Sequence, residues 1–288
     1  MSDLIVLNAV EVGSTEPTET IEQIIKDMRI KITTLKGKFM KADGSSVNYK
    51  DMGSSLEFKE YIRTCNQLTI VHLEQLTQAE LKCLFLNLYN SLTVHALVYQ
   101  NSKGTLPASP KDVDGFWRIH CYKIGNGVYS LDDMEHGVLR ANKGHPSNGA
   151  PQFSDTDIRS KCVVQILDPR IHFAINCGAL SCPPIRIYTV DRLDDQLEIA
   201  TTSFLSQEVV VKTAGVEVSK LLLWYVKNFI SSIHQVVVKT AGLEVSKLLL
   251  WYGKYLNSSF HQVVVKTAGM EVSKLLLWYG KYLNSSIH

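Results

Sequence analysis

The segment RIHFAINCGALSCPP, residues 170–184, holds the residue types in this chain that most readily do chemistry. His172 precedes Cys177 by five residues, and Cys177 precedes Cys182 by five. Thiolates and imidazoles bind metals, a thiol can attack a carbonyl with an imidazole as its base, and two thiols can form a redox pair. Cysteines also pack in protein cores without any chemistry. These four interpretations of the segment stay open on the sequence alone.

A zinc site and a redox pair both fit the spacing poorly. Structural zinc takes four ligands, mostly in closely spaced pairs, and this segment supplies three. A fourth ligand would have to come from His95, His120, His136 or Cys162. The two cysteines of the segment are also further apart than in the CxxC pair of thioredoxin-like proteins. We therefore predict neither a bound metal nor a cofactor.

A cysteine nucleophile needs a histidine within hydrogen-bond reach and a third group that orients this histidine. Such an enzyme would transfer or hydrolyse the acyl group of an amide or thioester. The candidate residues are Cys177 or Cys182 as nucleophile, His172 or His136 as base, and Glu135 or Asn87 as the orienting group. The alternative is a non-catalytic binding or adaptor module in which the same polar residues are structural.

Three helices are predicted from apolar residues at helical spacing. The first covers IEQIIKDMRIKITTL from Ile21, and the second covers SLEFKEYIRTCNQL, with a serine N-cap at 54 or 55. The stretch KADGSSVNYKDMGSS between them predicts a loop. Thr77 and Glu80 form a capping box before the third helix, which is apolar nearly all round over residues 83–97. This pattern is typical of a helix buried in the middle of a domain.

Polar residues inside that central helix need hydrogen-bond partners. Asn87, Asn90 and His95 lie there, and the spacing places Asn87 and His95 on roughly one face. Two interpretations follow: either they form a buried network that tethers loops, or the helix presents its polar edge to a functional site.

Strand patterns lie in the second half of the chain. IHCYKIGNGVYSL predicts a hairpin around Gly125-Asn126-Gly127, and Ser130 is a suitable N-cap for a helix LDDMEHGVLR. CVVQILD and RIHFAIN are apolar runs that predict buried strands, separated by Pro169. We therefore expect an α+β fold: a helix-rich single domain with a buried central helix and a small β-sheet, followed by repeated ββα segments.

The C-terminal part repeats one unit. VVVKTAG begins at Val209 and again at Val236 and Val263, and each copy predicts two strands and a serine-capped helix. The first copy is expected to complete the domain, which gives a mobile tail at 1–18, the domain at 19–234 and two extra copies at 235–288. Because the extra copies are as apolar as the first, we expect them to pack loosely on the surface, to compete with the first copy for its place, or to drive self-association.

Composition argues against several partner classes. The net charge is +2 for 288 residues, which indicates no nucleic-acid surface, and no apolar run reaches the roughly 18 residues of a membrane span. The N-terminus lacks the basic start of a secretory signal, and the six cysteines are too sparse for a disulfide scaffold. The expected location is therefore cytoplasmic, with reduced thiols.

Five segments occur together and in one order: FLNLYNSLTVHAL, SLDDMEHGVLR, DPRIHFAINCGALSCPPIRIYT, RLDDQLE followed by ATTSFL, and VEVSKLLLWYVKNF. In this the chain resembles the DUF547 family of uncharacterised domains, over about residues 20 to 230. The resemblance implies that the polar positions characteristic of the family are functionally important. In this chain they are Asn87, Asn90, His95, Glu135, His136, Arg140, Asp168, Arg170, His172, Cys177, Ser181, Cys182 and Pro183. Of these, Asn87, Asn90, His95, Arg140, Arg170 and Ser181 are the candidate binding residues.

The family often occurs beside glutaredoxin and DEP domains, and such proteins are labelled disulfide oxidoreductases. This chain has no CPYC motif of the glutaredoxin type, so the resemblance does not carry that activity over. The resemblance implies a coherent fold and marks a site, but it supplies no reaction.

Overall fold

A computed structural model of the chain describes residues 4–9, 20–42, 46–104, 109–145, 148–178, 182–208, 210–212 and 215–217. The chain divides into two compact units, Met1–Leu197 and Glu198–His288. The first unit is helix-rich with a small three-stranded sheet, which agrees with the α+β class. Within the described residues, no helix combines the length and the apolar character that crossing a membrane requires.

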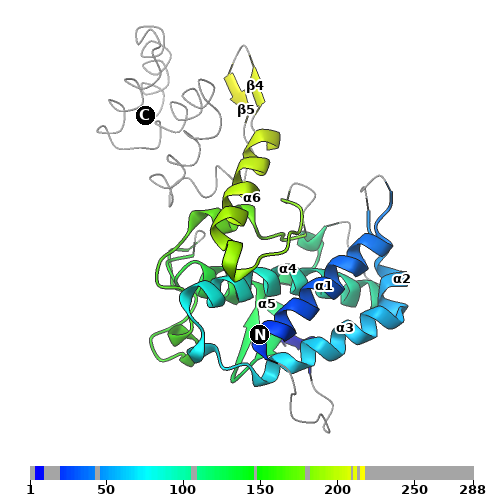
Figure 1. Ribbon diagram of the computed structural model, residues 1–288, viewed down its shortest axis with the longest axis horizontal. Helices are drawn as coiled ribbons and strands as arrows, with labels where there is room; N and C mark the ends of the chain where they lie inside the picture. Colours follow the sequence, from blue (N-terminus) through cyan, green and yellow to red (C-terminus); the bar gives the residue numbers. More distant parts are fainter. Residues whose placement is uncertain are drawn as a thin grey trace. The chain divides into compact units, whose positions relative to one another are not determined.

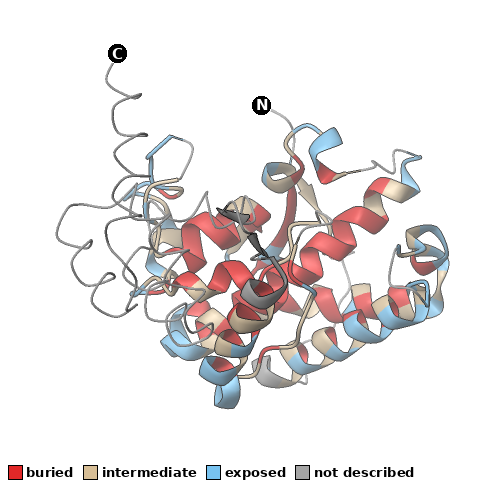
Figure 2. Ribbon diagram, turned by 90° about the horizontal axis from the view of Figure 1, so that it is seen from above, coloured by how far each residue is buried: buried red, intermediate tan, exposed pale blue. Residues whose placement is uncertain are grey.

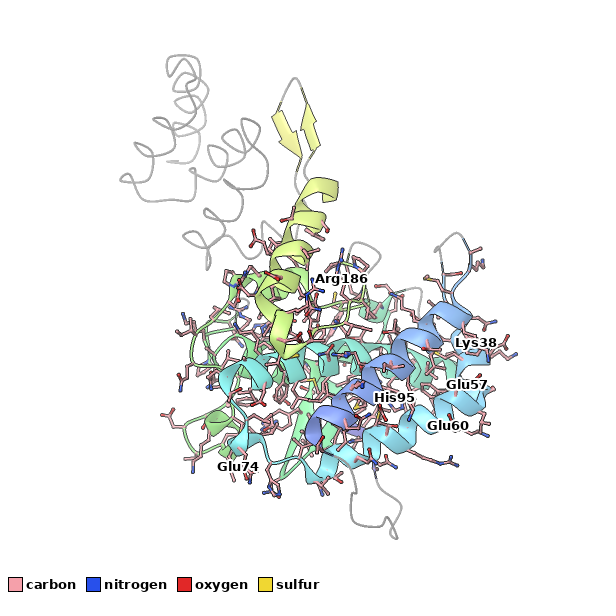
Figure 3. The ribbon with its side chains drawn as sticks, in the orientation of Figure 1. Lys38, Glu57, Glu60, Glu74, His95 and Arg186 are labelled. Atoms are coloured by element: carbon pink, nitrogen blue, oxygen red, sulfur yellow. The ribbon has the colours of Figure 1, made fainter. Side chains whose placement is uncertain are left out.

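Four helices build the first half of this unit: α1 (Ile21–Phe39), α2 (Tyr49–Ser54), α3 (Leu56–Asn66) and α4 (Gln78–Ser102). α1 packs side by side with α3 and also against α4 (Figure 1), and an ion pair between Lys38 and Glu57 joins the facing ends of α1 and α3 (Figure 3). α2 was not predicted, because the expected loop covers its residues. The Asn48 side chain caps α2 by accepting a hydrogen bond from the Asp51 N–H, a local contact that outweighs the turn-forming composition.

α4 is the buried central helix that the sequence predicts. The Thr77 hydroxyl accepts a hydrogen bond from the Glu80 N–H, and the Glu80 carboxylate accepts one from the Thr77 N–H, so the predicted capping box is confirmed. From Cys83 to Val98 every residue of α4 is buried, and the buried residues of the domain gather around it (Figure 2). A helix that is apolar on all sides must be packed against other elements on all sides. For α4 these elements are α1, α2, the sheet and the helical turn at residues 133–139.

The sheet has the order β1 (Ile5–Val6), β2 (His120–Ile124) and β3 (Gly127–Ser130). β2 and β3 form the predicted hairpin, with Cys121 opposite Ser130 and Gly125 at φ 53° in the turn. β1 pairs parallel to β2. Ile5 and Val6, which lie in the tail predicted at 1–18, thus belong to the sheet.

Asn8 explains why these N-terminal residues are fixed. Its side chain is fully buried, donates to the Cys65 and Lys123 carbonyls, and accepts from the Lys123 N–H. These contacts are long-range, and a strand of two residues has no periodicity, so the sequence pattern could not reveal them.

The predicted strand RIHFAIN is a 3-10 helix, η6 (Pro169–Phe173). Pro169 occupies its first turn, and the Asp168 side chain accepts a hydrogen bond from the Arg170 N–H as the N-cap. Proline at this position is preset for a helical turn. The run CVVQILD is also not a strand, and the N–H of Gln165 bonds the Gln78 side chain instead of a neighbouring strand. An apolar run of this length is compatible with a buried strand and with a buried helical turn, so the pattern does not distinguish the two.

Apart from α6, the remaining elements in the described part of the first unit are short. They are η1 (Gln67–Ile70), η2 (Leu73–Gln75), η3 (Pro110–Asp112), α5 (Phe116–Ile119), the π-helix η4 (Asp133–Leu139), η5 (Ile158–Lys161) and η7 (Val190–Arg192). α6 (Leu193–Glu208) spans the division between the two units.

The second unit is described only in part. β4 (Val210–Lys212) and β5 (Gly215–Glu217) pair as an antiparallel hairpin at the start of the first repeat copy. The rest of that copy and both extra copies lie outside the described residues, as does the boundary expected after residue 234. The repeated helices and the self-association of the extra copies stay predictions.

Candidate functional site

The π-helix η4 presents two of the candidate residues, Glu135 and His136, from inside the domain. Its start is fixed by reciprocal bonds: the Ser130 hydroxyl accepts from the Asp133 N–H at 3.1 Å, and the Asp133 carboxylate accepts from the Ser130 N–H at 2.9 Å. The predicted serine cap is confirmed, but the turns that follow are wider than those of an α-helix. Wide turns of this kind are frequent at functional sites.

A carboxylate and an imidazole meet at the centre of the candidate site. Oε1 of Glu135 lies 3.5 Å from Nδ1 of His172, and both side chains are almost fully buried. The Tyr89 hydroxyl of α4 donates to Oε2 of Glu135 at 3.2 Å. Burial lowers the pKa of His172, and the hydrogen bond to Glu135 opposes this. The net effect is a His172 pKa below its ordinary value, with the Glu135 carboxylate beside the ring.

A pair of imidazoles adjoins Glu135. The rings of His136 and His145 meet edge to face, with 4.0 Å between their centroids. Burial lowers the pKa of His136 to about 4; Glu135 opposes that shift, while His145, Arg140 and His172 add to it. No sequence motif singled out His145, because it lies in a turn-rich loop and makes this contact only in the folded domain.

Arg140 brings a positive charge to the same cluster. The side chain is 1% exposed, and its Nη2 donates to the Gly144 carbonyl at 3.5 Å. Its charge contributes to the lowered pKa values of His136, His145 and His172. We call Glu135, His136, Arg140, His145 and His172 the imidazole cluster.

Asp132 is a further titratable group that the sequence pattern did not mark as functional. Burial first, and then the charges of Glu135 and Asp133, raise the pKa of Asp132 to about 7, while Arg118 opposes the shift. Asp133 instead accepts hydrogen bonds from Arg159 and Ser130. The run of three carboxylates at 132, 133 and 135 was the available indication, since closely spaced like charges raise one another's pKa.

The two thiols of the segment lie against each other. Sγ of Cys177 is 3.1 Å from Sγ of Cys182, and both residues are partly buried thiols. The Asn176 side chain donates to the Pro183 carbonyl at 2.8 Å and accepts from the Gly178 N–H at 2.9 Å. One amide therefore ties together the two ends of the segment that carries the thiols. Ser181 lies outside the described residues.

Asn87 and Asn90 hold main-chain segments to α4. Asn90 donates to the Ala174 carbonyl at 3.0 Å and accepts from the Asn176 N–H at 2.8 Å. Asn87 donates to the Tyr188 carbonyl at 3.0 Å and accepts from the Tyr188 N–H at 3.1 Å. Each side-chain amide thus replaces a backbone partner. Asn90 fixes the segment that leads to Cys177, and the Asn87 amide is occupied away from the imidazoles.

His95 belongs to a different cluster. It projects from α4 toward α3 (Figure 3), where its Nδ1 lies 3.0 Å from the Tyr122 hydroxyl and its ring meets Phe58 and Tyr61 edge to face. Burial lowers the pKa of His95 to about 3. The contacts of Asn87 and His95 are with different elements, so the expected shared face does not bring them to one site.

Arg170 forms ion pairs. Its guanidinium donates twice to Asp168, at 3.0 Å to each oxygen, and also pairs with Asp194. Lys82 of α4 meets the same Asp168 carboxylate at 3.2 Å. The hydrogen bonds that Arg170 donates to Asp168 raise the pKa of Arg170. This network fixes the start of η6, and with it the position of His172.

The other cysteines are poor nucleophiles. Burial raises the pKa of Cys65 and of Cys121 to about 12, and that of Cys83 to about 11. Cys162 is partly exposed, and its pKa is also raised. Across the described ranges, no group of three or more His, Cys, Asp or Glu side chains is arranged to hold a metal ion.

Comparison with known proteins finds a single kind of match. Residues 73–205 match the family described as "Protein of unknown function, DUF547". No curated protein and no solved structure matches the chain. The matched residues contain α4, the imidazole cluster and the thiol pair, so both parts of the candidate site lie within the matched region. Over residues 73–205, which are fewer than half of the chain, the protein is therefore similar to the DUF547 family.

Proposed function

We propose that this domain is a thiol-dependent enzyme that transfers or hydrolyses the acyl group of an amide or thioester. Cys177 is the nucleophile, His172 is the base, and Glu135 orients the base. The contact of 3.5 Å between the buried Glu135 carboxylate and Nδ1 of His172 carries the proposal. A carboxylate in that position selects the ring orientation and stabilises the imidazolium that forms when the base takes a proton.

The lowered pKa of His172 suits a base that waits in the neutral form. Cys177 Sγ attacks the carbonyl carbon as its proton passes to His172, and the imidazolium then returns that proton to the leaving amine or thiol. The acyl group is now a thioester on Cys177. Water hydrolyses it, or a second amine or thiol accepts it, with His172 again taking the proton of the attacking group.

Cys177 is chosen over Cys182 because its main chain is held on both sides. The N–H of the preceding Asn176 bonds Asn90, and the Cys177 carbonyl accepts from Nε1 of Trp117 at 3.2 Å. A rigidly placed nucleophile loses less entropy on reaching its reactive geometry. The proposal requires the Cys177 thiol to reach His172 in the substrate complex, where catalytic hydrogen bonds often tighten.

Alkylation tests the proposal on the full chain. Reduced protein is treated with iodoacetamide at about pH 6.5, and each cysteine peptide is followed by mass spectrometry. We expect Cys177 to be labelled at least about tenfold faster than Cys162, and Glu135→Gln to remove most of that difference. A thioester substrate should leave one acyl group on Cys177 in the wild type and none in Cys177→Ser. Equal, slow labelling of Cys177 and Cys162 overturns the proposal.

One observation favours the second candidate, a non-catalytic binding or adaptor module. Asn87, Asn90 and His95 all direct their polar atoms to other parts of the same domain. If Cys177 is unreactive and the imidazole-cluster variant Glu135→Gln loses stability rather than reactivity, the module is the better account.

A further inference from the structure

The Cys177–Cys182 contact supports an inference that does not depend on acyl transfer. A disulfide has a sulfur–sulfur distance of about 2.0 Å, so the two sulfur atoms, 3.1 Å apart, need to approach by only about 1 Å. We propose that Cys177 and Cys182 form a redox-active dithiol that closes reversibly to an intramolecular disulfide by exchange with a low-molecular-weight disulfide such as glutathione disulfide. Its effect on activity rests on the proposed function, because closing the pair consumes the nucleophile.

The described residues next to the two cysteines are held close to each other. Asn176 bonds both the Pro183 carbonyl and the Gly178 N–H, which keeps the residues next to the two cysteines together. Gly178 has φ 90°, and a Cβ there would lie 2.6 Å from Cγ of Pro110. A conformation restricted to glycine thus turns the chain directly after Cys177. Because the two sulfur atoms are already 3.1 Å apart, closing the disulfide needs a small adjustment of the two cysteine side chains.

Exposure separates this pair from the remaining cysteines. Cys65, Cys83 and Cys121 are buried, and their raised pKa values disfavour the thiolate that exchange requires. Cys162 is partly exposed, as the pair is, but it lies outside the pair, so it is the matched control for reaction at a single thiol.

The exchange balances in two steps. The thiolate of one cysteine attacks glutathione disulfide, forms a mixed disulfide and releases one glutathione thiolate. The thiolate of the second cysteine then attacks the protein sulfur of that mixed disulfide and releases the second glutathione. The protein loses two electrons and two protons, and one glutathione disulfide becomes two glutathione thiols. Excess reduced glutathione reverses both steps.

Intact-mass and peptide mass spectrometry test the proposal. Reduced full-length protein is incubated with glutathione disulfide and quenched in acid. We expect the wild type and Cys162→Ser to lose two hydrogens at the 177–182 peptide without retaining glutathione there, and dithiothreitol to restore both thiols. Cys177→Ser and Cys182→Ser should each stop with one bound glutathione, because the second thiol is missing.

Three results would overturn the dithiol. They are a wild type that retains glutathione on both cysteines, a pair that stays reduced while Cys162 reacts, and stoichiometric zinc held by the two thiols of the purified protein. The alkylation experiment keeps the two proposals apart. If the disulfide forms but Cys177 is alkylated slowly, the enzyme proposal is rejected and the dithiol proposal stands. If Cys177 is alkylated fast but no disulfide forms, the dithiol proposal is rejected and the enzyme proposal stands.

Discussion

Two buried polar regions lie on different parts of the domain and differ in kind. Around His95 the partners are the Tyr122 hydroxyl and the rings of Phe58 and Tyr61, all neutral groups. In the imidazole cluster, a carboxylate and a guanidinium adjoin three imidazoles, and the pKa values of those imidazoles respond to both charges. Burial and a lowered histidine pKa are common to both regions. What distinguishes the imidazole cluster is its opposing charges, and these are what a proton-transfer site needs.

Acid should have the largest effect, because it acts on both regions together. His95 and His136 stay neutral in the folded chain, with pKa values of about 3 and about 4, but take up protons near 6.5 when unfolded. Their depressed folded values contribute stability that is fully present above about pH 6.5 and is lost as pH falls toward the folded values. Each histidine should lower the unfolding free energy by about 1.4 kcal/mol per pH unit in that window.

Urea denaturation at several pH values measures this slope. His95→Gln should lose the contribution of one histidine, while the slope due to His136 stays. If His95→Gln leaves the slope unchanged, His95 is not held neutral in the fold, and the comparison of the two regions fails.

Removing the His95 ring should separate stability from reactivity. His95→Ala leaves a cavity among Phe58, Tyr61 and Tyr122 and should cost about 2–5 kcal/mol in unfolding free energy. The rate of Cys177 alkylation should stay within about twofold of the wild type under conditions where the variant is folded. Denaturation and alkylation on the same samples provide the check. A parallel loss of both would mean that the two regions are coupled.

Glu135→Gln should have the opposite effect, with a larger change in the reactivity of Cys177 than in stability. Glutamine keeps the size of the side chain and can still accept from Tyr89, but it cannot stabilise a protonated His172. We expect the alkylation rate of Cys177 to fall about tenfold, which corresponds to about 1.4 kcal/mol in the barrier, with a smaller change in unfolding free energy. Tyr89→Phe is the matched control, because it removes the hydroxyl and keeps the charge. It should have a weaker effect on the rate.

The smallest effect is expected at the loop that holds the thiols. Asn176→Ala removes the bonds to Pro183 and Gly178 and should lower the unfolding free energy by about 1–2 kcal/mol. It should also slow disulfide closure, so that a mixed disulfide with glutathione becomes detectable. Closure as fast as in the wild type would show that Asn176 does not preorganise the pair.

Local patterns in the sequence predicted the elements that local interactions determine. The apolar spacing of α1 and α4, the capping box at Thr77 and the turn at Gly125 all act within a few residues. β1 could not be found this way, because Asn8 and its partners are far apart in sequence. η6 was taken for a strand because RIHFAIN is an apolar run with Ile171, Phe173 and Ile175 at alternate positions, although Asp168 and Pro169 carried the signature of a helical turn.

The same distinction applies to the candidate site. The sequence pointed to Glu135, His136 and His172, and the fold places Glu135 against His172. The pattern also grouped His95 with them through its position on α4. Between Asn87 and His95, however, the helix turns far enough to direct His95 to another face. His145 and Asp132 were missed because their properties arise from neighbours and burial rather than from a motif.

The central claim is that a neutral His172, oriented by Glu135, acts as the base for Cys177. The pH dependence of iodoacetamide alkylation at Cys177, with Cys162 as the internal reference, tests it most directly. We predict that the Cys162 rate falls about tenfold per pH unit below its pKa, while the Cys177 rate stays nearly level from about pH 8 to about pH 6 and loses that plateau in Glu135→Gln. Parallel profiles for Cys177 and Cys162 in the wild type would contradict the account.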